Sequence, residues 1–237
     1  MAILKFVMSC DGSESPELLP ILESGDRLSC QEFERRYHRL PQLKKAELVE
    51  EIVYVPSPLR YHRHGKSHSQ MVAWLEIYAA ATPGLEVADN ATVRLDSKNE
   101  PQPDVLLRLD ENLGGNSRIS EDDYVEGAPE LIVEIAGSSA SYDLHDKKQA
   151  YHRNGVREYL VWLVAENEFR WYVWEYPGYR QQVPDDGGIL KSPFFPGLWL
   201  DGAALLAGDR QRVLSVVNSQ IQSAEHERFV RQLSDQR

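Results

Sequence analysis

The sequence predicts a mixed α/β fold in which helices pack on a central β-sheet. Three apolar strand candidates lie between two helical segments, and a β-rich segment follows the second helix. This order of elements is typical of a mixed sheet covered by helices. The chain has 237 residues, of which 42% are hydrophobic, so one sizeable core is expected. We expect a loose extension over residues 1–27, one α/β domain over 28–200 and a helical tail over 201–237.

The segment before the predicted sheet reads as a helix followed by a hairpin. Ser29 and Glu32 fit a capping box, in which the two side chains satisfy free N–H groups at a helix start. Apolar residues continue at helical spacing until Pro41 ends the pattern. Residues 46–55 predict two short strands that meet near Glu50. A helical and hairpin lead-in to the sheet is therefore expected.

A helix is predicted over residues 67–81, because its large apolar side chains recur at core spacing. Three strand candidates follow. The loop between the last two is long enough to be functional or mobile. The strand candidates are residues 85–95, 103–109 and 131–136, and the loop is residues 110–127.

A second helix is predicted over residues 142–154, because Gly155 is the residue type that commonly stands just past a helix end. The β-rich stretch 158–164 comes next, and the alternating aromatic residues over 168–175 suggest its hairpin partner. The tail from residue 203 onward has helical propensity and mixed charge, so we expect a C-terminal helix.

The charge balance restricts how this chain could bind a nucleic acid. Its 37 acidic and 26 basic residues give a net charge of −11, whereas proteins that coat phosphate backbones are usually basic. A nuclease of this composition needs a local basic face and a bound cation. Residues 60–66, Arg-Tyr-His-Arg-His-Gly-Lys, could supply part of that face, although a solvated loop explains them equally well.

Cellular location is indicated by two further features of the sequence. It contains no run of 18 or more apolar residues, so no membrane span is expected. Cys10 and Cys30 form neither a disulfide framework nor a metal-binding spacing, which favours the reducing cytoplasm.

Two carboxylates in apolar strands are the central candidates for chemistry. Asp104 begins one strand candidate, and Glu134 lies inside Leu-Ile-Val-Glu-Ile-Ala, on the face opposite Leu131 and Val133. A carboxylate in such a strand is costly to bury unless it is paired or bound to metal. Hard oxygen ligands of this kind suit Mg²⁺ or Mn²⁺, which bind through one or two carboxylates, waters and substrate phosphate.

The helix after the Glu134 strand offers a cation. Asp143, Lys147 and Tyr151 are spaced four residues apart, so they share one side of that helix. If the helix packs back over the strand, the Lys147 ammonium could reach the metal site and position a water or offset phosphate charge. Tyr151, and His64 from the basic segment, are possible substrate contacts.

With these residues the chain resembles a bacterial family of restriction-endonuclease-like proteins within the PD-(D/E)XK nuclease superfamily. The resemblance covers roughly residues 28–200, and the ordered set of motifs with its spacings carries it. The matching stretches are Ala46-Glu-Leu-Val, Pro56-Ser-Pro58, Pro103-Asp104-Val, Ala128-Pro-Glu-Leu-Ile-Val-Glu134-Ile, Asp143-x-x-x-Lys147-x-x-x-Tyr151 and Gly155-Val-Arg-Glu-Tyr159.

The resemblance implies a restriction-endonuclease-like core and a role for each matching residue. Asp104 and Glu134 resemble the two metal-binding acids, and the backbone carbonyl of Ile135 is expected to face the metal. Glu47 resembles an acidic position that helps to hold metal or to orient water. Lys147 resembles the catalytic lysine of a branch that supplies it from the following helix.

The implied activity is that of a Mg²⁺-dependent endonuclease, which hydrolyses phosphodiester bonds, expected in DNA, with a metal-activated water. A homodimer is implied as well, because many nucleases of this superfamily pair to cut both strands. The chain departs from the family's frequent Ser-Pro-Ser-Thr turn, with Gly-Ser-Ser-Ala at residues 137–140. This difference leaves every proposed metal ligand in place, and it bears only on the geometry of the loop after Glu134.

Other interpretations stay open at the level of sequence. Asp143 and Lys147 could be only a surface ion pair, and Asp104 could begin a strand at the solvent edge. The whole chain could be a catalytically silent binding module that keeps the nuclease fold. A glycosidase using Asp104 and Glu134 would need neither metal nor lysine. Ser138 and Ser139 form no nucleophile elbow, so a serine hydrolase is not expected.

Overall fold

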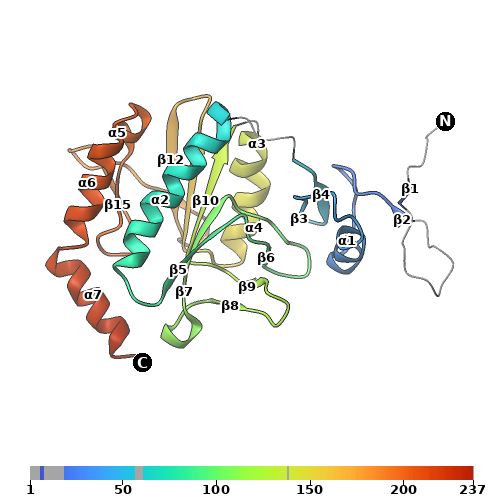
Figure 1. Cartoon of the computed structure of the whole chain (residues 1–237), viewed down its shortest axis with the longest axis horizontal. Coiled ribbons are helices and arrows are strands. Elements are labelled where there is room, and N and C mark those ends of the chain that lie inside the picture. Colours follow the sequence, from blue (N-terminus) through green and yellow to red (C-terminus); the bar gives the residue numbers. More distant parts are fainter. Residues whose placement is uncertain (1–5, 8–18, 57–60, 138, 237) are drawn as a thin grey trace.

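A computed structural model describes residues 6–7, 19–56, 61–137 and 139–236, and its centre is a six-stranded mixed sheet (Figure 1). The strand order is β13-β12-β11-β10-β7-β5. Only β10 and β11 run parallel to each other, and the other neighbours pair antiparallel. The strands are β5 (Leu85–Asp89), β7 (Val105–Leu109), β10 (Leu131–Ala136), β11 (Glu158–Leu163), β12 (Glu168–Val173) and β13 (Arg180–Gln181).

Helices cover both faces of this sheet, as the sequence predicts. On one face α2 (Lys66–Ala80) buries Trp74 in the same core cluster as Leu131 and Val133 of β10. The intervening β10 residues point to the other face, where Ile132 packs in a second core cluster. The strand alternation therefore puts Glu134 on the face opposite α2. The predicted mixed sheet with flanking helices is confirmed.

A crossover segment joins the two parallel strands and covers the Glu134 face. A direct hairpin cannot connect parallel strands, so the chain must cross over the sheet between β10 and β11. It does so through α3 (Ala140–Tyr142), the π-helical turn η3 (Asp143–Lys147) and α4 (Lys148–Arg153). The helix predicted over 142–154 thus lies where expected, with a wider turn in its first half.

The predicted strand over residues 85–95 is in fact two strands in different sheets. After β5, Asn90 adopts a left-handed conformation with φ 52°, which asparagine tolerates, and redirects the chain. The next strand, β6 (Val93–Arg94), joins a three-stranded sheet of order β6-β9-β8. The other two strands, β8 (Ser117–Ile119) and β9 (Val125–Gly127), come from the predicted long loop 110–127. That segment also contains the short 3₁₀ turn η2 (Glu111–Leu113).

The N-terminal lead-in contains the predicted helix and hairpin. Helix α1 (Cys30–Tyr37) begins after Ser29, whose hydroxyl accepts a hydrogen bond from the Glu32 N–H. Strands β3 (Glu47–Val49) and β4 (Ile52–Tyr54) form an antiparallel hairpin. Ahead of them β1 (Phe6–Val7) pairs with β2 (Leu19–Pro20). Of residues 1–27, predicted to form a loose extension, 1–5 and 8–18 lie outside the described part of the chain. Within the described part Leu22 is buried and Arg27 forms a β-bridge with Ile52, so residues 19–27 are packed against the hairpin.

The C-terminal tail is helical, as predicted, and it forms three helices rather than one. Helix α6 packs against α2, and α7 is joined to the end of α2 by a 2.9 Å contact between His226 Nε2 and Thr82 Oγ1. Among the described residues no helix is long and apolar enough to cross a membrane. The tail follows the hairpin β14 (Ile189–Lys191) and β15 (Trp199–Asp201) and comprises α5 (Gly202–Leu206), α6 (Arg210–Gln220) and α7 (Ala224–Ser234).

Candidate active site

Sheet pairing brings Asp104 next to Glu134. Strand β7 runs antiparallel to β10, with Val105 opposite Val133. Asp104 stands immediately before β7, and its Oδ2 accepts a 2.7 Å hydrogen bond from the backbone N–H of Ile135. Asp104 and Glu134 are only 5% and 3% exposed. Asp104 is thus inside the fold and not at a solvent edge.

The crossover helix places Lys147 directly on Glu134. The Lys147 Nζ lies 2.9 Å from Glu134 Oε1 and 2.8 Å from Glu47 Oε1. The Asp143 Oδ1 is 3.8 Å away on the same helix side. Because Lys147 is 2% exposed and Asp143 1% exposed, this is a buried ionic cluster and not a surface ion pair.

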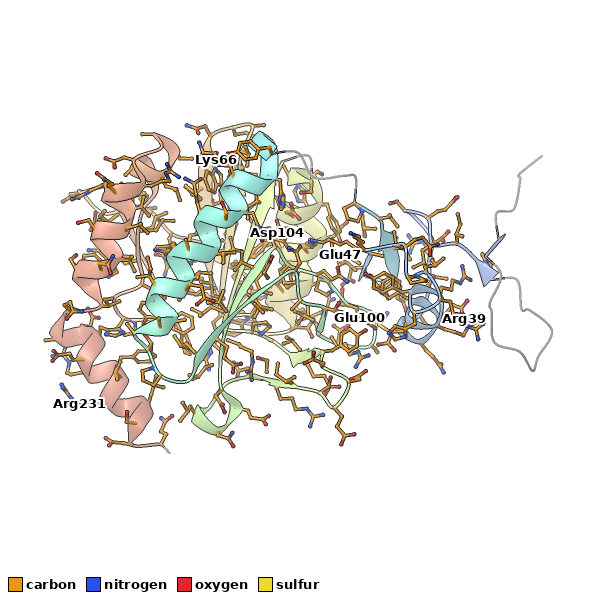
Figure 2. All side chains as sticks on the ribbon, viewed as in Figure 1. Arg39, Glu47, Lys66, Glu100, Asp104 and Arg231 are labelled. Carbon is orange, nitrogen blue, oxygen red and sulfur yellow. The ribbon has the colours of Figure 1, made fainter. Side chains whose placement is uncertain are left out.

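Glu47 reaches this cluster from the N-terminal hairpin. In Figure 2, Glu47 lies on the side of the hairpin that faces the central sheet, and Asp104 lies at the sheet. The Glu47 Oε1 also accepts a 2.7 Å hydrogen bond from the Gln102 N–H, just before Asp104 along the chain. This contact joins the hairpin to the segment that carries Asp104. The site therefore draws on the lead-in, β7, β10 and the crossover helix.

Asp104 and Glu134 have opposite electrostatic environments. Burial raises the pKa of Glu134, and the charges of Asp104, Asp143 and Glu47 add to that rise, whereas Lys147 opposes it. Burial would also raise the pKa of Asp104, but a hydrogen bond from His64, the positive charge of Lys45 and the Ile135 N–H together hold it below its usual range. Asp104 is therefore held as a carboxylate.

The charge on Lys147 is maintained by its neighbours. Burial alone would lower the pKa of this amine. Attraction to Glu134, Glu47 and Asp143 outweighs that effect and raises the pKa of Lys147 well above its ordinary value. A fully buried ammonium is consequently available beside two carboxylates that could face a ligand.

The donor set suits a small hard cation. Among the described residues no group of three His, Cys, Asp or Glu side chains forms a metal-binding cluster. Mg²⁺, however, needs only one or two carboxylates, because waters and substrate phosphate complete its shell. Glu134 accepts hydrogen bonds from Lys147 and Tyr151, and Glu47 accepts them from Lys147 and Gln102, in every case on Oε1. Their Oε2 atoms are left for another ligand, so the residues present fit the cation.

The comparison with protein families identifies the group to which this arrangement belongs. A family model described as "Uma2: Putative restriction endonuclease" matches residues 30–203. The chain belongs to the Uma2 family. The family resemblance predicted from the sequence motifs is thereby confirmed. No curated protein matches this chain.

A solved structure supports the same fold for this Uma2-family chain. The structure is that of a "putative nuclease belonging to DUF820" from Anabaena variabilis ATCC 29413, with a TM-score of 0.53. The two chains are 12% identical, and the match covers 77% of this chain and 97% of the other. At 12% identity, the structural similarity is evidence for a shared fold alone. The restriction-endonuclease-like architecture expected from the sequence is therefore confirmed.

His64, Tyr151 and the Ile135 carbonyl are the other groups that the sequence predicted for the site. His64 is 8% exposed, and its Nε2 lies 3.0 Å from Asp104 Oδ1. Tyr151 is completely buried and donates a 3.0 Å hydrogen bond to Glu134 Oε1. The Ile135 carbonyl accepts a 3.0 Å hydrogen bond from the Gly137 N–H. Of the basic segment 60–66, residue 60 lies outside the described residues.

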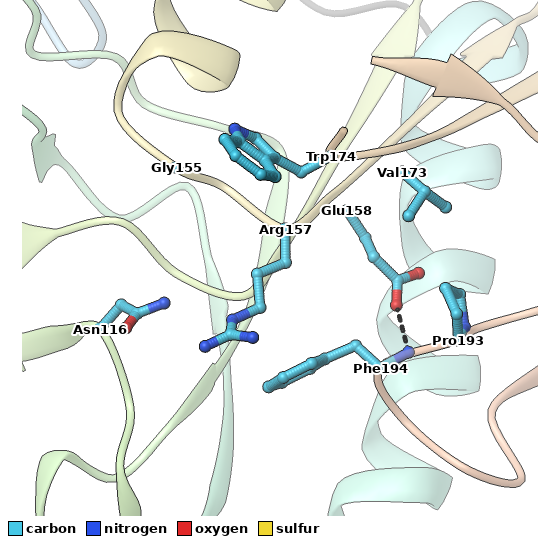
Figure 3. Close-up of a pocket in the computed structure, with 8 residues that line it drawn as sticks. All are labelled: Asn116, Gly155, Arg157, Glu158, Val173, Trp174, Pro193 and Phe194. Carbon is cyan, nitrogen blue, oxygen red and sulfur yellow. Dashed lines mark hydrogen bonds between the residues drawn. The ribbon is translucent and has the colours of Figure 1, made fainter. Parts of the chain in front are cut away.

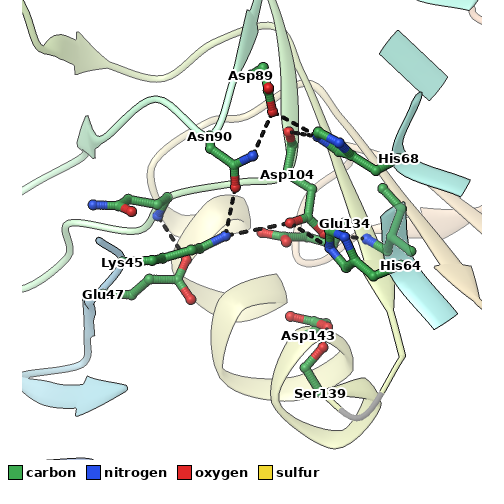
Figure 4. A network of polar contacts seen from close by, with 12 residues as sticks. Lys45, Glu47, His64, His68, Asp89, Asn90, Asp104, Glu134, Ser139 and Asp143 are labelled. Carbon is green, nitrogen blue, oxygen red and sulfur yellow. Dashed lines mark hydrogen bonds and ion pairs between the residues drawn. The ribbon is translucent and has the colours of Figure 1, made fainter. Parts of the chain in front are cut away.

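Several basic and polar residues at the site were missed from the sequence (Figure 4). Lys45 Nζ lies 3.4 Å from Asp104 Oδ1 and donates to Asn90 Oδ1 at 3.1 Å. His68 Nε2 lies 2.8 Å from both the Asp104 carbonyl and Asp89 Oδ1. Two spacings in the sequence could have pointed to Lys45 and His68. Lys45 stands two residues before Glu47, as expected for one face of an extended chain, and His68 stands four residues after His64.

Proposed function

We propose that this Uma2-family chain is a divalent-metal-dependent endonuclease that hydrolyses phosphodiester bonds in DNA. One observation carries the proposal: the buried Lys147 ammonium contacts Glu134 and Glu47, beside Asp104 on the neighbouring strand. A purely structural core has no need for this arrangement, because burying several charges costs more free energy than packing apolar residues of similar volume. The family description gives independent support.

The proposed cofactor is Mg²⁺ or Mn²⁺. Asp104 and Glu134 would hold it, with the Ile135 carbonyl alongside and Glu47 contributing or orienting water. When bound, the ion would supply Lewis-acid stabilisation of the phosphate and lower the pKa of a water. Asp104 fits this role because His64 and Ile135 fix its orientation and keep it ionised.

The residues of the chain itself would perform the remaining tasks. The Lys147 ammonium would orient the attacking water or offset the charge that develops on the scissile phosphate. Tyr151 donates a hydrogen bond to the same Glu134 Oε1 that Lys147 contacts, so the carboxylate has little freedom to rotate. Such positioning by groups that are already fixed lowers the cost of reaching the reactive geometry.

Local basic residues would meet the backbone phosphates of the substrate. The chain as a whole carries a net charge of −11 and would repel DNA at long range. At the site, however, Lys45, His64 and His68 gather around Asp104. We propose that these residues act as the local basic face that a nuclease of this composition needs.

Calorimetric titration of Mg²⁺ and Mn²⁺, run beside a nicking assay on supercoiled DNA, tests the proposal. Wild type should bind metal and nick, and Glu134→Gln and Lys147→Met should fail to nick. Glu225→Gln removes one negative charge, as Glu134→Gln does, but on the exposed surface of α7, so it is the matched control for Glu134→Gln and should behave like wild type.

Each contrary result points to a different alternative. Metal binding without nicking would redirect the search to another phosphate substrate. Absence of metal binding in the wild type, even with DNA present, would favour a catalytically silent binding module. Hydrolysis of glycosides without any divalent ion would favour the two-carboxylate glycosidase.

A further inference from the structure

A second site lies at the end of the sheet away from the carboxylate cluster. A pocket of about 420 Å³ opens where β11 begins and β12 ends, within the size range of ligand sites (Figure 3). Glu158, the first residue of β11, pairs with Leu131, whereas Glu134 pairs with Val161 three residues further along. The pocket is therefore roughly 10 Å along the strands from Glu134.

Trp174 gives the pocket a fixed aromatic face. Its side chain is 42% exposed, although its Nε1 donates a 2.9 Å hydrogen bond to the His152 carbonyl. The indole also stacks on the His152 ring, with centroids 5.5 Å apart and an interplanar angle of 13°. An indole that is held on one side and exposed on another is a platform on which a flat ligand can stack.

Phe194 and Arg157 form the opposite part of the pocket. The Arg157 guanidinium lies 4.2 Å from the centre of the Phe194 ring. The loop that carries Phe194 is anchored by Glu158, whose Oε1 accepts hydrogen bonds from the Phe194 N–H at 3.1 Å and from the Ser192 hydroxyl. The ring and the guanidinium are consequently presented by a well-fixed backbone.

The Arg157 guanidinium makes no direct ion pair with the acidic residues that the structure describes. Among the residues that the structure describes, no carboxylate lies within ion-pair distance of its guanidinium, although the chain holds 37 acids against 26 bases. The nearby Glu130 carboxylate accepts hydrogen bonds from the Leu109 and Asn116 N–H groups instead. The positive charge of Arg157 opposes the rise in the pKa of Glu130, so these two groups interact at longer range. No direct ion pair occupies the guanidinium, and its planar fork suits phosphate.

We infer that this pocket binds a nucleotide, with the base stacked on Trp174 and the phosphate on Arg157. Aromatic platforms combined with arginine are the usual means by which proteins hold unpaired nucleotides without reading their sequence. The Asn116 side chain at the rim adds an amide that can hydrogen-bond a base edge or a sugar hydroxyl. The occupant is an unpaired nucleotide of a DNA strand, and this part of the inference rests on the proposed function.

The test measures binding in EDTA, so that it depends on neither metal nor cleavage. A fluorescently labelled ten-nucleotide single strand, its duplex form and a deoxynucleoside monophosphate are titrated into the full chain, the first two by anisotropy and the last by calorimetry. Arg157→Gln and Trp174→Leu should weaken single-strand binding by roughly tenfold or more, given the usual contribution of one stacked base. Arg228→Gln, an exposed arginine on α7, is the matched control and should bind like wild type.

The outcomes separate this inference from the proposed function. Equal weakening by Arg157→Gln and Arg228→Gln, or no binding by wild type, overturns the nucleotide pocket even if the chain nicks DNA. Preserved single-strand binding in Glu134→Gln supports the pocket even if no nicking is ever seen. Binding of the monophosphate but not of the single strand supports the pocket and identifies a free nucleotide as its occupant. Because Arg157 is exposed, Arg157→Gln tests the pocket even if Trp174→Leu fails to fold.

Discussion

Lys147 Nζ and Glu134 Oε1 lie 2.9 Å apart, and both side chains are almost completely removed from solvent. The same ammonium lies 2.8 Å from Glu47 Oε1, which comes from the separate N-terminal hairpin. One lysine thus balances carboxylates that would otherwise repel one another inside the fold. Removal of the ammonium leaves the buried carboxylates without their shared counter-charge, and the first prediction follows from this relationship.

Replacing Lys147 with Met should destabilise the metal-free protein by about 3 kcal/mol or more at neutral pH, because the carboxylates lose their common counter-charge. The double variant Lys147→Met, Glu134→Gln should recover part of this loss. Urea unfolding of the single and double variants measures both effects. Lys98→Met removes an exposed ion pair with Glu51 and should change stability by less than about 1 kcal/mol. A similar small change in Lys147→Met would contradict the buried cluster.

Asp104→Asn should abolish binding of Mg²⁺ or Mn²⁺ while the apo protein stays folded. The asparagine keeps an oxygen that can accept the Ile135 N–H, but it loses the negative charge that a divalent ion requires. Calorimetry reports metal binding, and thermal unfolding reports the fold. Asp186→Asn, in an exposed turn, controls for the change in net charge. Loss of folded structure in Asp104→Asn alone would instead assign Asp104 a structural role.

Tyr151→Phe should reduce the nicking rate, because the Tyr151 hydroxyl holds Glu134 Oε1 at 3.0 Å. It should also lower stability by roughly 1–2 kcal/mol, the usual range for losing a buried hydrogen bond. Tyr179→Phe is a matched control, because the Tyr179 hydroxyl donates a 2.7 Å hydrogen bond to the Val156 carbonyl away from the cluster. Both variants should lose stability, and only Tyr151→Phe should lose activity. Equal nicking rates would show that Tyr151 does not position Glu134 for catalysis.

Glu158→Gln should alter how stability depends on pH. Burial raises the pKa of Glu158 from 4.5 to about 7, although hydrogen bonds from Ser192 and Phe194 oppose this. The folded state therefore binds the proton more tightly than the unfolded state, so this group weakens stability as pH rises from about 4.5 to about 7. Across that pH window, the free energy of unfolding of Glu158→Gln relative to wild type should rise by up to about 3 kcal/mol.

Urea unfolding at several pH values between 4 and 8 gives the difference between Glu158→Gln and wild type. The Glu225→Gln variant should show a difference that hardly varies with pH, since Glu225 is exposed. A difference for Glu158→Gln that is constant with pH would mean that Glu158 titrates at its ordinary pKa.

Local patterns in the sequence predicted much of the fold and the core of the candidate site. Alternation along residues 131–136 predicts that Glu134 faces away from Leu131 and Val133, and the two core clusters bear this out. The spacing of Asp143, Lys147 and Tyr151 predicts one shared helix side, and all three are buried in the structure. These features depend on the periods of strand and helix, which short stretches of sequence specify.

Tertiary structure alone decided which distant residues meet. The hydrogen bond from Ile135 to Asp104 joins positions 31 residues apart, and the contact of Lys45 with Asp104 spans 59 residues. The left-handed conformation of Asn90 also divides the predicted strand 85–95 into two strands, and strand propensity does not reveal this division. Such contacts arise from sheet order and from the docking of the hairpin, and their free energy comes from burial and charge neutralisation across the whole fold. No local period encodes them, so the sequence by itself determined the faces of the elements, and only packing decided their partners.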